Sequence, residues 1–387
     1  MYVFHDNCKE WQGYKPCINQ KKGATFSCNG CKFYKPIRRN ILMIEAGGLG
    51  SALRASVVTK EIKNHNPDSR IQWLTNERVV ELVNNNFSSV DRVYPTTWES
   101  LIVLGMQSYS QIINFESNPI YLSFVSNFDT EKKGFVANKL GNLSSASNSA
   151  TEFLRLQTDD FFRRRKNKKS MQQILLEVSG MKWKKQSYDL ARNQDDDKWA
   201  RLFLKARGIS ETEMTIGLNI GSSLKHSAKR WPPQYFYELA KICQKHRSEL
   251  KLLVLAGQDD IDAYEVIARL NSVSPLNNLI FTGYNNTLSQ FVSLINHIPI
   301  VISADTFGLH VALGLGKRTI SLWGPQPEHE TYSYEREIKI SLGLTCAPCF
   351  SGNANGCSNP NTLQCMKEIS VQRVFHCLCN ELKKLKM

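Results

Sequence analysis

The sequence predicts an α/β protein made of two Rossmann-like, doubly wound domains, and three observations lead to this prediction. At 387 residues the chain is long enough for two domains that each bury a core. Short apolar, β-branched runs alternate with helical segments, which is typical of parallel sheets with crossover helices. Several of these runs end in glycine-rich or polar turns, which is where open α/β sheets bind ligands.

The first domain is expected over residues 39–210. Its first strand is the buried run ILMIEA at 41–46, and a glycine-rich turn leads from it into a helix at about 52–65. Further strands are expected at 71–74, 91–94 and 111–115. The remaining expected elements are a polar loop at 144–150, helices at 152–180 and 195–206, and an interdomain linker at 208–215.

The second domain is expected over residues 211–369. Residues 216–240 read as a strand, a glycine-rich turn and a helix, and the next strand ends at Gly257. The most informative unit combines a buried strand at 298–302, the polar segment SADTFGLH at 303–310, a short helix at 310–315 and a strand at 319–323. A basic helix, assigned to residues 370–387, closes the chain.

The polar segment 303–310 lies at the carboxyl end of its strand. Backbone N–H groups at the start of the following helix, beside Asp305, Thr306 and His310, suit a phosphate and its sugar. The same Asp-Thr pair is also an ordinary helix N-cap, so this segment alone leaves both interpretations open.

Three segments occur together in one order: GLNIGSS followed by KRWPP, a strand that ends in AGQDD, and SADTFGLHVALGLGKRTISLWGP. In these segments the chain resembles glycosyltransferase family 9, the heptosyltransferases, whose patterns read GLNPGA…KRWP, LGGPED and SSDTGxxHxAxALGKPxxxLFGPT. The resemblance implies a GT-B fold, in which two Rossmann-like domains face a cleft and the last helix packs back on the N-terminal domain. It also implies inverting transfer of heptose or a related sugar from an ADP-heptose-like donor. The acceptor would be a glycan of lipopolysaccharide type or a protein.

The same resemblance assigns the residues that bind the nucleotide sugar. Lys229 stands at the motif position of the family's phosphate-binding lysine, where a fixed positive charge stabilises the leaving diphosphate. The full expected set is Gly47, Gly50, Ser222, Ser223, Lys229, Gly257, Asp305, Thr306, Gly308 and His310.

The catalytic base is where this chain departs from the family. The family's first turn reads GxxGDxxRTTP, and its Asp is taken as the base, but Ser51 stands at that position here. A serine needs an activator to act as a base at neutral pH, and the sequence reveals none. Glu116 is the alternative, because it follows the strand 111–115 and so faces the cleft from a carboxyl end. Glu45 is less attractive, because a position inside the first strand points its side chain at the core or a helix.

Two classes of function therefore stay open. The first is an active inverting glycosyltransferase with Glu116, or an activated Ser51, as the catalytic residue. The second is a catalytically weak or silent relative that binds a nucleotide sugar as the scaffold of a glycosylation complex. The Asp-x-Asp strings at 195–197 and 260–262 are better explained as helix starts. No catalytic divalent ion is required, because lysine and backbone dipoles can stabilise the leaving group.

Eight of the eleven cysteines form two sets, each with one Cys-x-x-Cys pair among glycine, proline and asparagine. Such sets are typical of tetrahedral thiolate sites. We therefore expect two structural metal ions, zinc or iron, with the first stapling a cysteine-rich arm over residues 1–38. The expected ligands are Cys8, Cys17, Cys28 and Cys31 in one site and Cys346, Cys349, Cys357 and Cys365 in the other.

The formal net charge of +14 implies attraction to anions such as nucleotide diphosphates or an anionic membrane surface. No RNA- or DNA-binding signature accompanies the charge, so nucleic acid is not expected as a partner. No apolar run is long enough to span a membrane, and the N-terminus lacks the apolar core of a signal peptide. We expect a cytoplasmic protein with peripheral contact to the inner membrane, and the sequence leaves open whether it forms a homo-oligomer.

Overall fold

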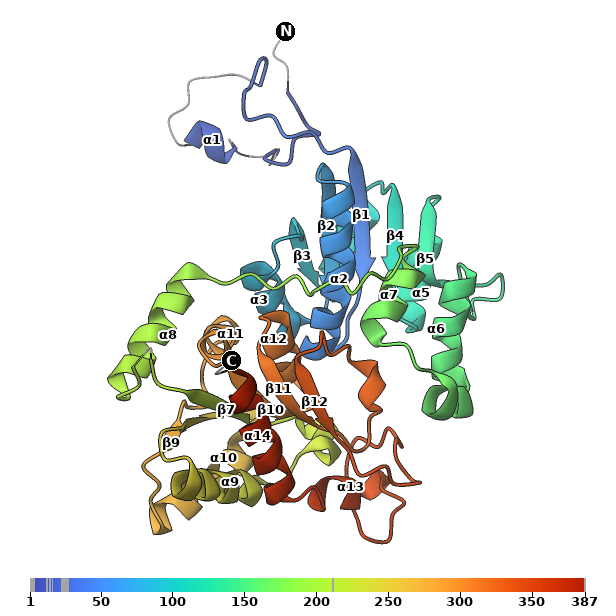
Figure 1. The fold of residues 1–387 in the computed structure, drawn as a ribbon. Coiled ribbons are helices and arrows are strands. Elements are labelled where there is room, and N and C mark those ends of the chain that lie inside the picture. Colours follow the sequence, from blue (N-terminus) through green and yellow to red (C-terminus); the bar gives the residue numbers. More distant parts are fainter. Residues whose placement is uncertain are drawn as a thin grey trace.

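The computed structural model describes residues 4–11, 13, 15, 17–21, 28–210 and 212–385. Within these residues the chain folds into two six-stranded sheets, one in each half, with helices on both sides (Figure 1). The α/β prediction with two doubly wound sheets is therefore confirmed. Parts of the expected cysteine-rich arm, residue 211 and the chain end at 386–387 lie outside the described residues.

The first sheet has the strand order β3-β2-β1-β4-β5-β6. Its first five strands are parallel, and β6 pairs antiparallel to β5. The strands are β1 (Arg39–Ile44), β2 (Ser69–Thr75), β3 (Arg92–Pro95), β4 (Gln111–Asn114), β5 (Glu131–Ala137) and β6 (Leu143–Ser145). The first strand ends two residues earlier than the apolar run suggested, so Glu45 follows the strand instead of lying inside it.

Helices cover both faces of the first sheet. They are α2 (Leu49–His65), α3 (Glu77–Asn86), α4 (Trp98–Gly105), α5 (Pro119–Ser126), α6 (Asn148–Thr158) and α7 (Met171–Val178). Side chains of α2, α3, α6 and α7 join the large core cluster, whereas α4 and α5 enclose a smaller one on the opposite face. This arrangement leaves the carboxyl ends of the strands open toward the second half.

Two predictions for this half are corrected by the structure. The stretch 144–150 is not a plain loop, because it contributes to β6 and to the start of α6, which the Ser147 side chain caps. The long helix expected at 152–180 is broken into α6, a π-helical turn at Phe162–Lys166 and α7. The Asp159 carboxylate accepts the Phe162 N–H at the first break, and Ser170 caps α7 at the second.

The second sheet is entirely parallel, with the order β12-β11-β10-β7-β8-β9. Its strands are β7 (Thr215–Asn219), β8 (Lys251–Leu255), β9 (Leu279–Phe281), β10 (Ile300–Ala304), β11 (Arg318–Leu322) and β12 (Glu337–Ile340). Its helices are α8 (Gln194–Ala206), α9 (Pro233–His246), α10 (Ile261–Val273), α11 (Leu288–Asn296), α12 (Phe307–Gly314), α13 (Gln364–Lys367) and α14 (Val371–Leu385). Both sheets thus show the strand order of a Rossmann fold.

The two halves meet where α2 packs against α12 and α3 packs against α11. The chain crosses between the halves in an extended segment at 179–193, ahead of α8 (Figure 1). Helix α8 then buries Ala200 and Leu204 against α11, so the expected linker at 208–215 and the domain boundary at 210 are misplaced.

The last helix is also corrected. The expected return to the N-terminal domain is wrong, because the apolar stripe of α14 packs against α9 and β11 of the second half. Val374 and Leu378 of this stripe are fully buried in the second core.

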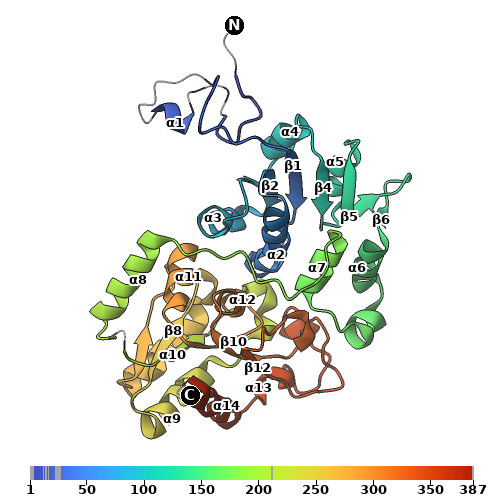
Figure 2. The same ribbon diagram turned by 45° about the horizontal axis from the view of Figure 1, so that its top comes forward.

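The N-terminal arm carries the short helix α1 (Ile18–Lys21). It lies beyond the first sheet, away from the interface between the two halves (Figure 2). Lys9 ties it to the sheet by a hydrogen bond to the Pro67 carbonyl. No helix among the described residues is long and apolar enough to cross a membrane.

Candidate functional site

A cavity of about 380 Å³ opens at the carboxyl ends of β1 and β4. It takes most of its lining from the first half, and Glu330 of the second half closes it. Its polar lining residues are Glu45, Ser51, Arg54, Glu116, Gln157, Arg163, Asn167 and Glu330, and Phe115, Phe153, Leu156, Met171 and Leu175 are its apolar ones. This is the edge at which parallel sheets bind ligands.

Lys229, which is half-buried, and Asp305, which is buried, form an ion pair close to Arg54 and Glu330 of this cavity. Lys229 Nζ lies 2.6 Å from Asp305 Oδ2, and the Asp305 side chain is only 6% exposed. His310 Nε2 lies 3.6 Å from the other carboxylate oxygen. Burial opposes ionisation of Asp305, but the charge of Lys229 and the His310 ring outweigh it and hold the pKa of Asp305 well below its usual range. The lysine predicted to bind phosphate is thus paired with a carboxylate of its own chain.

His310 is fixed from two sides. Tyr188, on the segment that crosses between the halves, places its hydroxyl 3.1 Å from Nδ1. From the other side, Gly50 approaches so closely that a Cβ atom there would lie 3.0 Å from Cδ2 of His310. Burial lowers the pKa of His310, although Asp305 offsets part of this effect. The predicted Gly50 and His310 are therefore in contact across the two halves, and the ring is favoured in its neutral form.

Thr306 and Gly308 shape the start of α12. The amide of Asn219 donates to Thr306 Oγ1 at 2.7 Å and to Ser303 Oγ. A Cβ atom on Gly308 would lie 2.6 Å from the Asn219 side chain, so glycine is needed for this close packing. Thr306 is the N-cap of α12, but its side chain makes no capping hydrogen bond.

The remaining predicted donor-site residues lie on loops held by Arg230. The guanidinium of Arg230 donates to the Ser222 carbonyl and pairs with Asp260 and Asp262. Asp260 in turn accepts the Gly257 N–H at 2.9 Å, which supports the structural interpretation of the 260–262 string. The Ser222 hydroxyl donates a hydrogen bond to the His226 carbonyl. Ser223 is exposed and lies beside the His226 ring.

Glu116 lines the cavity, as its position after β4 suggested. Its Oε1 accepts the Ala46 N–H at 2.7 Å, and burial raises its pKa against that hydrogen bond. Ser51 lines the same cavity, and its Oγ accepts a hydrogen bond from Arg54 Nη2 at 3.4 Å. No histidine is hydrogen-bonded to Ser51 among the described residues, so the arrangement gives this hydroxyl no activating histidine.

Several residues of the site were missed by sequence reasoning. Glu45 had been set aside, yet it lines the cavity because β1 ends at Ile44. Arg54 lies one helical turn after Ser51, at the Arg of the family pattern GxxGDxxR, and its Nη1 lies 3.7 Å from Glu330. Burial raises the pKa of Glu330, and Arg54 counters this effect. The family pattern signalled Arg54, whereas nothing local signalled Glu330.

Gly47 sits between two cavity residues. A Cβ atom on Gly47 would lie 2.6 Å from Glu45 Oε1 and 3.1 Å from Ser51 Oγ. The glycine predicted to contact the nucleotide sugar therefore lets the Glu45 carboxyl and the Ser51 hydroxyl approach each other.

In the part of the chain that the structure describes, the cysteine side chains are not arranged as a metal-binding group. Among the described residues, no group of three or more His, Cys, Asp or Glu side chains could hold a metal ion. The structure therefore does not support the prediction of two metal sites with four cysteine ligands each. It does show that each set of four thiols lines one small cavity: Cys8, Cys17, Cys28 and Cys31 in the arm, and Cys346, Cys349, Cys357 and Cys365 near the C-terminus.

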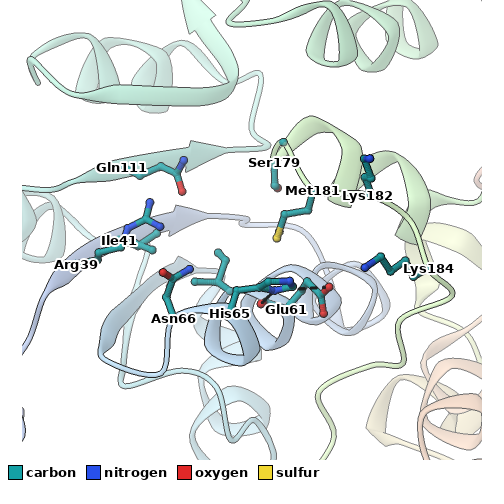
Figure 3. A pocket seen from close by; sticks show the side chains of 12 residues that line it. Arg39, Ile41, Glu61, His65, Asn66, Gln111, Ser179, Met181, Lys182 and Lys184 are labelled. Carbon is teal, nitrogen blue, oxygen red and sulfur yellow. Dashed lines mark hydrogen bonds and ion pairs between the residues drawn. The ribbon is translucent and has the colours of Figure 1, made fainter.

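A second cavity of about 370 Å³ lies at the opposite, amino end of the first sheet (Figure 3). Arg39, Lys182 and Lys184 line it together with Glu61 and His65, which lie side by side. It lies at the amino end of the strands, and none of the predicted site residues lines it, so we assign the functional site to the cavity between the halves.

Comparison with known proteins shows which family and fold the chain resembles. A model of glycosyltransferase family 9 (heptosyltransferase) matches residues 162–358. Lipopolysaccharide heptosyltransferase 1 of Campylobacter coli is 21% identical over 316 residues, covering 78% of this chain and 87% of that protein.

Solved structures of the same fold cover most of the chain. The ADP-heptose lipopolysaccharide heptosyltransferase II of E. coli superposes with a TM-score of 0.66 at 16% identity, covering 90% of this chain and 100% of that one. A family 9 glycosyltransferase from Veillonella parvula gives 0.61 at 17% identity, covering 78% and 86%. TibC of enterotoxigenic E. coli, an iron-containing dodecameric glycosyltransferase, gives 0.52 at 11% identity, covering 90% and 77%.

Proposed function

Because the chain belongs to glycosyltransferase family 9, the heptosyltransferases, we propose that it transfers a heptose from ADP-heptose to a glycan with inversion. One observation carries the proposal: Glu116 lines a cavity between the halves, and the Lys229–Asp305–His310 cluster lies beside that cavity. A base on one side and a fixed cation on the other are what nucleophilic displacement of a nucleoside diphosphate requires.

The donor would bind in the second half. The diphosphate of the donor would form an ion pair with the ammonium of Lys229, in place of the pairing of that ammonium with Asp305. Backbone N–H groups at the start of α12, next to Thr306 and Gly308, would supply further donors. Gly47, Ser222, Ser223 and Gly257 lie in the loops that follow the strands, and Gly50 lies in the first turn of α2. Lysine and backbone dipoles then replace a divalent ion in stabilising the leaving group.

The acceptor would enter the cavity of the first half, where Glu116 removes the proton of its attacking hydroxyl. Burial raises the pKa of Glu116, which makes it a stronger base than an exposed glutamate while the Ala46 N–H limits the shift. Arg54 and Arg163 add positive charge to this side of the cavity and suit an acidic glycan. Ser51 contacts the acceptor without serving as the base.

The names of the relatives support the choice of substrates. They describe transfer in lipopolysaccharide synthesis and ADP-heptose as donor, so we place the reaction on a lipopolysaccharide-type glycan at the cytoplasmic face of the inner membrane. A homo-oligomer is the variant suggested by the glycosyltransferase TibC, which is described as dodecameric. A protein acceptor is the alternative that the sequence resemblance implies.

We further propose that each cysteine set holds one structural zinc or iron ion. The support is the convergence of four thiols on one cavity in both places, together with the iron-containing description of TibC. Elemental analysis of protein purified without chelator would detect about two ions per chain, and a brown colour would indicate iron.

A catalytically silent scaffold is the second candidate, and one observation favours it. Ser51 replaces the family's Asp, and the structure offers it no activating histidine among the residues it describes. The experiment is incubation of purified protein with ADP-heptose and a deacylated lipopolysaccharide inner-core oligosaccharide, followed by mass spectrometry of the oligosaccharide. A gain of one heptose supports the transferase. Tight ADP-heptose binding without any transfer supports the scaffold.

A further inference from the structure

Two carboxyl groups stand side by side at the floor of the cavity between the halves. Glu45 directly follows β1, Glu116 follows β4, and these strands are parallel neighbours whose register pairs Ile44 with Asn114. Both side chains line the cavity. The proposed reaction uses only one of them as a base, so the other has no assigned part.

The contacts of Glu45 leave half of its carboxyl free. Its Oε1 accepts the Gly47 N–H at 3.1 Å, and Oε2 is buried without any partner among the described residues. The residue is 6% exposed. A buried polar oxygen without a partner is costly, and natural proteins keep such a group mainly where a ligand or a water satisfies it.

The charges around Glu45 favour its neutral form. Glu116 is the nearest carboxyl, and Arg54 is the nearby cation, but Arg54 is shared with Glu330 and Ser51. Burial and the neighbouring Glu116 raise the pKa of Glu45 to about 8, against smaller opposing effects of the Gly47 N–H and Arg54. The protonated form of Glu45 is therefore favoured at neutral pH, and a protonated carboxyl can donate a hydrogen bond.

We propose that Glu45 is an acceptor-binding residue, whose carboxyl donates a hydrogen bond to an oxygen of the acceptor glycan next to the hydroxyl that Glu116 deprotonates. The inference rests on the proposed function for the position of the acceptor. Glu45 and Glu116 would thus have different roles, one as hydrogen-bond donor and one as base, because their surroundings differ.

The test is calorimetric binding of a deacylated lipopolysaccharide inner-core oligosaccharide to the full chain saturated with ADP. Glu45→Leu keeps the volume and removes the donor, and we expect it to weaken binding about tenfold at pH 7, the usual effect of one lost hydrogen bond. Glu45→Gln restores an N–H donor, so most of the affinity should return. Glu61→Leu, at a carboxyl beside the other cavity, is the matched control.

The pH dependence separates this function from a structural one. In the wild type the hydrogen bond is lost as pH rises through about 8, so affinity should fall between about pH 7 and 9.5. In Glu45→Gln the N–H does not titrate, so the affinity should stay level over the same range. Equal affinity of Glu45→Leu and wild type, or the same pH dependence in wild type and Glu45→Gln, would overturn the inference, as would absence of oligosaccharide binding.

An infrared titration keeps the inference testable if Glu45→Leu does not fold. The wild type should lose a protonated-carboxyl C=O band near a pH of about 8 that is missing from Glu45→Gln, and an identical band in both proteins would refute it. Failure of the proposed function looks different: the wild type would bind the oligosaccharide and yet transfer no heptose to it.

Discussion

Removal of Lys229 separates the binding role of this residue from its structural role. Its ammonium lies 2.6 Å from a carboxylate that is only 6% exposed, so Lys229→Met leaves Asp305 buried with His310 as its remaining partner at 3.6 Å. Breaking a buried ion pair by removing one partner costs ~3–5 kcal/mol. We expect a loss of this size in the free energy of unfolding, measured by urea denaturation.

The Lys229–Asp305 pair also makes the stability of the fold depend on pH. Asp305 has a lowered pKa in the folded chain, so its ionisation stabilises the fold above the pKa of the unfolded chain, and this stabilisation is lost as pH falls. Without Lys229 the pKa of Asp305 moves up toward its ordinary value. Because the pKa values of Asp305 in the folded and unfolded chains then lie closer together, the variant should lose less stability than the wild type as pH falls below the pKa of the unfolded chain.

The double variant Lys229→Met with Asp305→Asn isolates the ligand contact. It removes both charges, so most of the stability should return, whereas the affinity for ADP should stay weakened by ~2–4 kcal/mol because the phosphate has lost its cation. Lys225→Met, at an exposed lysine nearby, is the control. Wild-type stability of the single variant, or wild-type ADP affinity of the double one by calorimetry, would refute the reasoning.

Further predictions concern packing, proton linkage and the thiols. Gly50→Val should separate α2 from α12 and cut transfer at least about tenfold, because its Cβ would lie 3.0 Å from the His310 ring; Gly48→Val, with nothing within 4 Å, should retain transfer. The wild type should lose stability as pH rises from about 5 to 8, because over this range the Glu45 carboxyl ionises only in the unfolded chain. In Glu45→Gln the free energy of unfolding, measured in urea, should not show this decrease. Cys349→Ser should lower the yield of folded protein more than the specific activity of the part that folds.

The sequence predicted the parts of the site that follow one strand directly. Asp305 directly follows β10, whereas Lys229 lies in the segment after β7 and His310 in the helix after β10. These residues lie together because β7 and β10 are parallel neighbours, which brings the segments that follow them to one edge of the sheet. Glu116 lines the cavity for the same reason.

The rest depended on details that local patterns do not carry. Glu45 was misplaced because an apolar run does not show that its strand ends at Ile44 instead of residue 46. Tyr188 reaches His310 from an extended segment with no periodicity. The last helix packs on its own half because its apolar stripe fits α9, and an apolar stripe does not name its partner.

The measurement that tests the account most directly is the rate of heptose transfer by the wild type and by Glu116→Gln, with ADP affinity measured on both proteins. Glutamine keeps the shape of Glu116 but removes its basicity, so transfer should fall by roughly 10²–10⁴-fold while ADP affinity stays within about twofold. Ser51→Ala, measured alongside, should have only a mild effect. Loss of transfer in Ser51→Ala together with full transfer by Glu116→Gln would contradict the account.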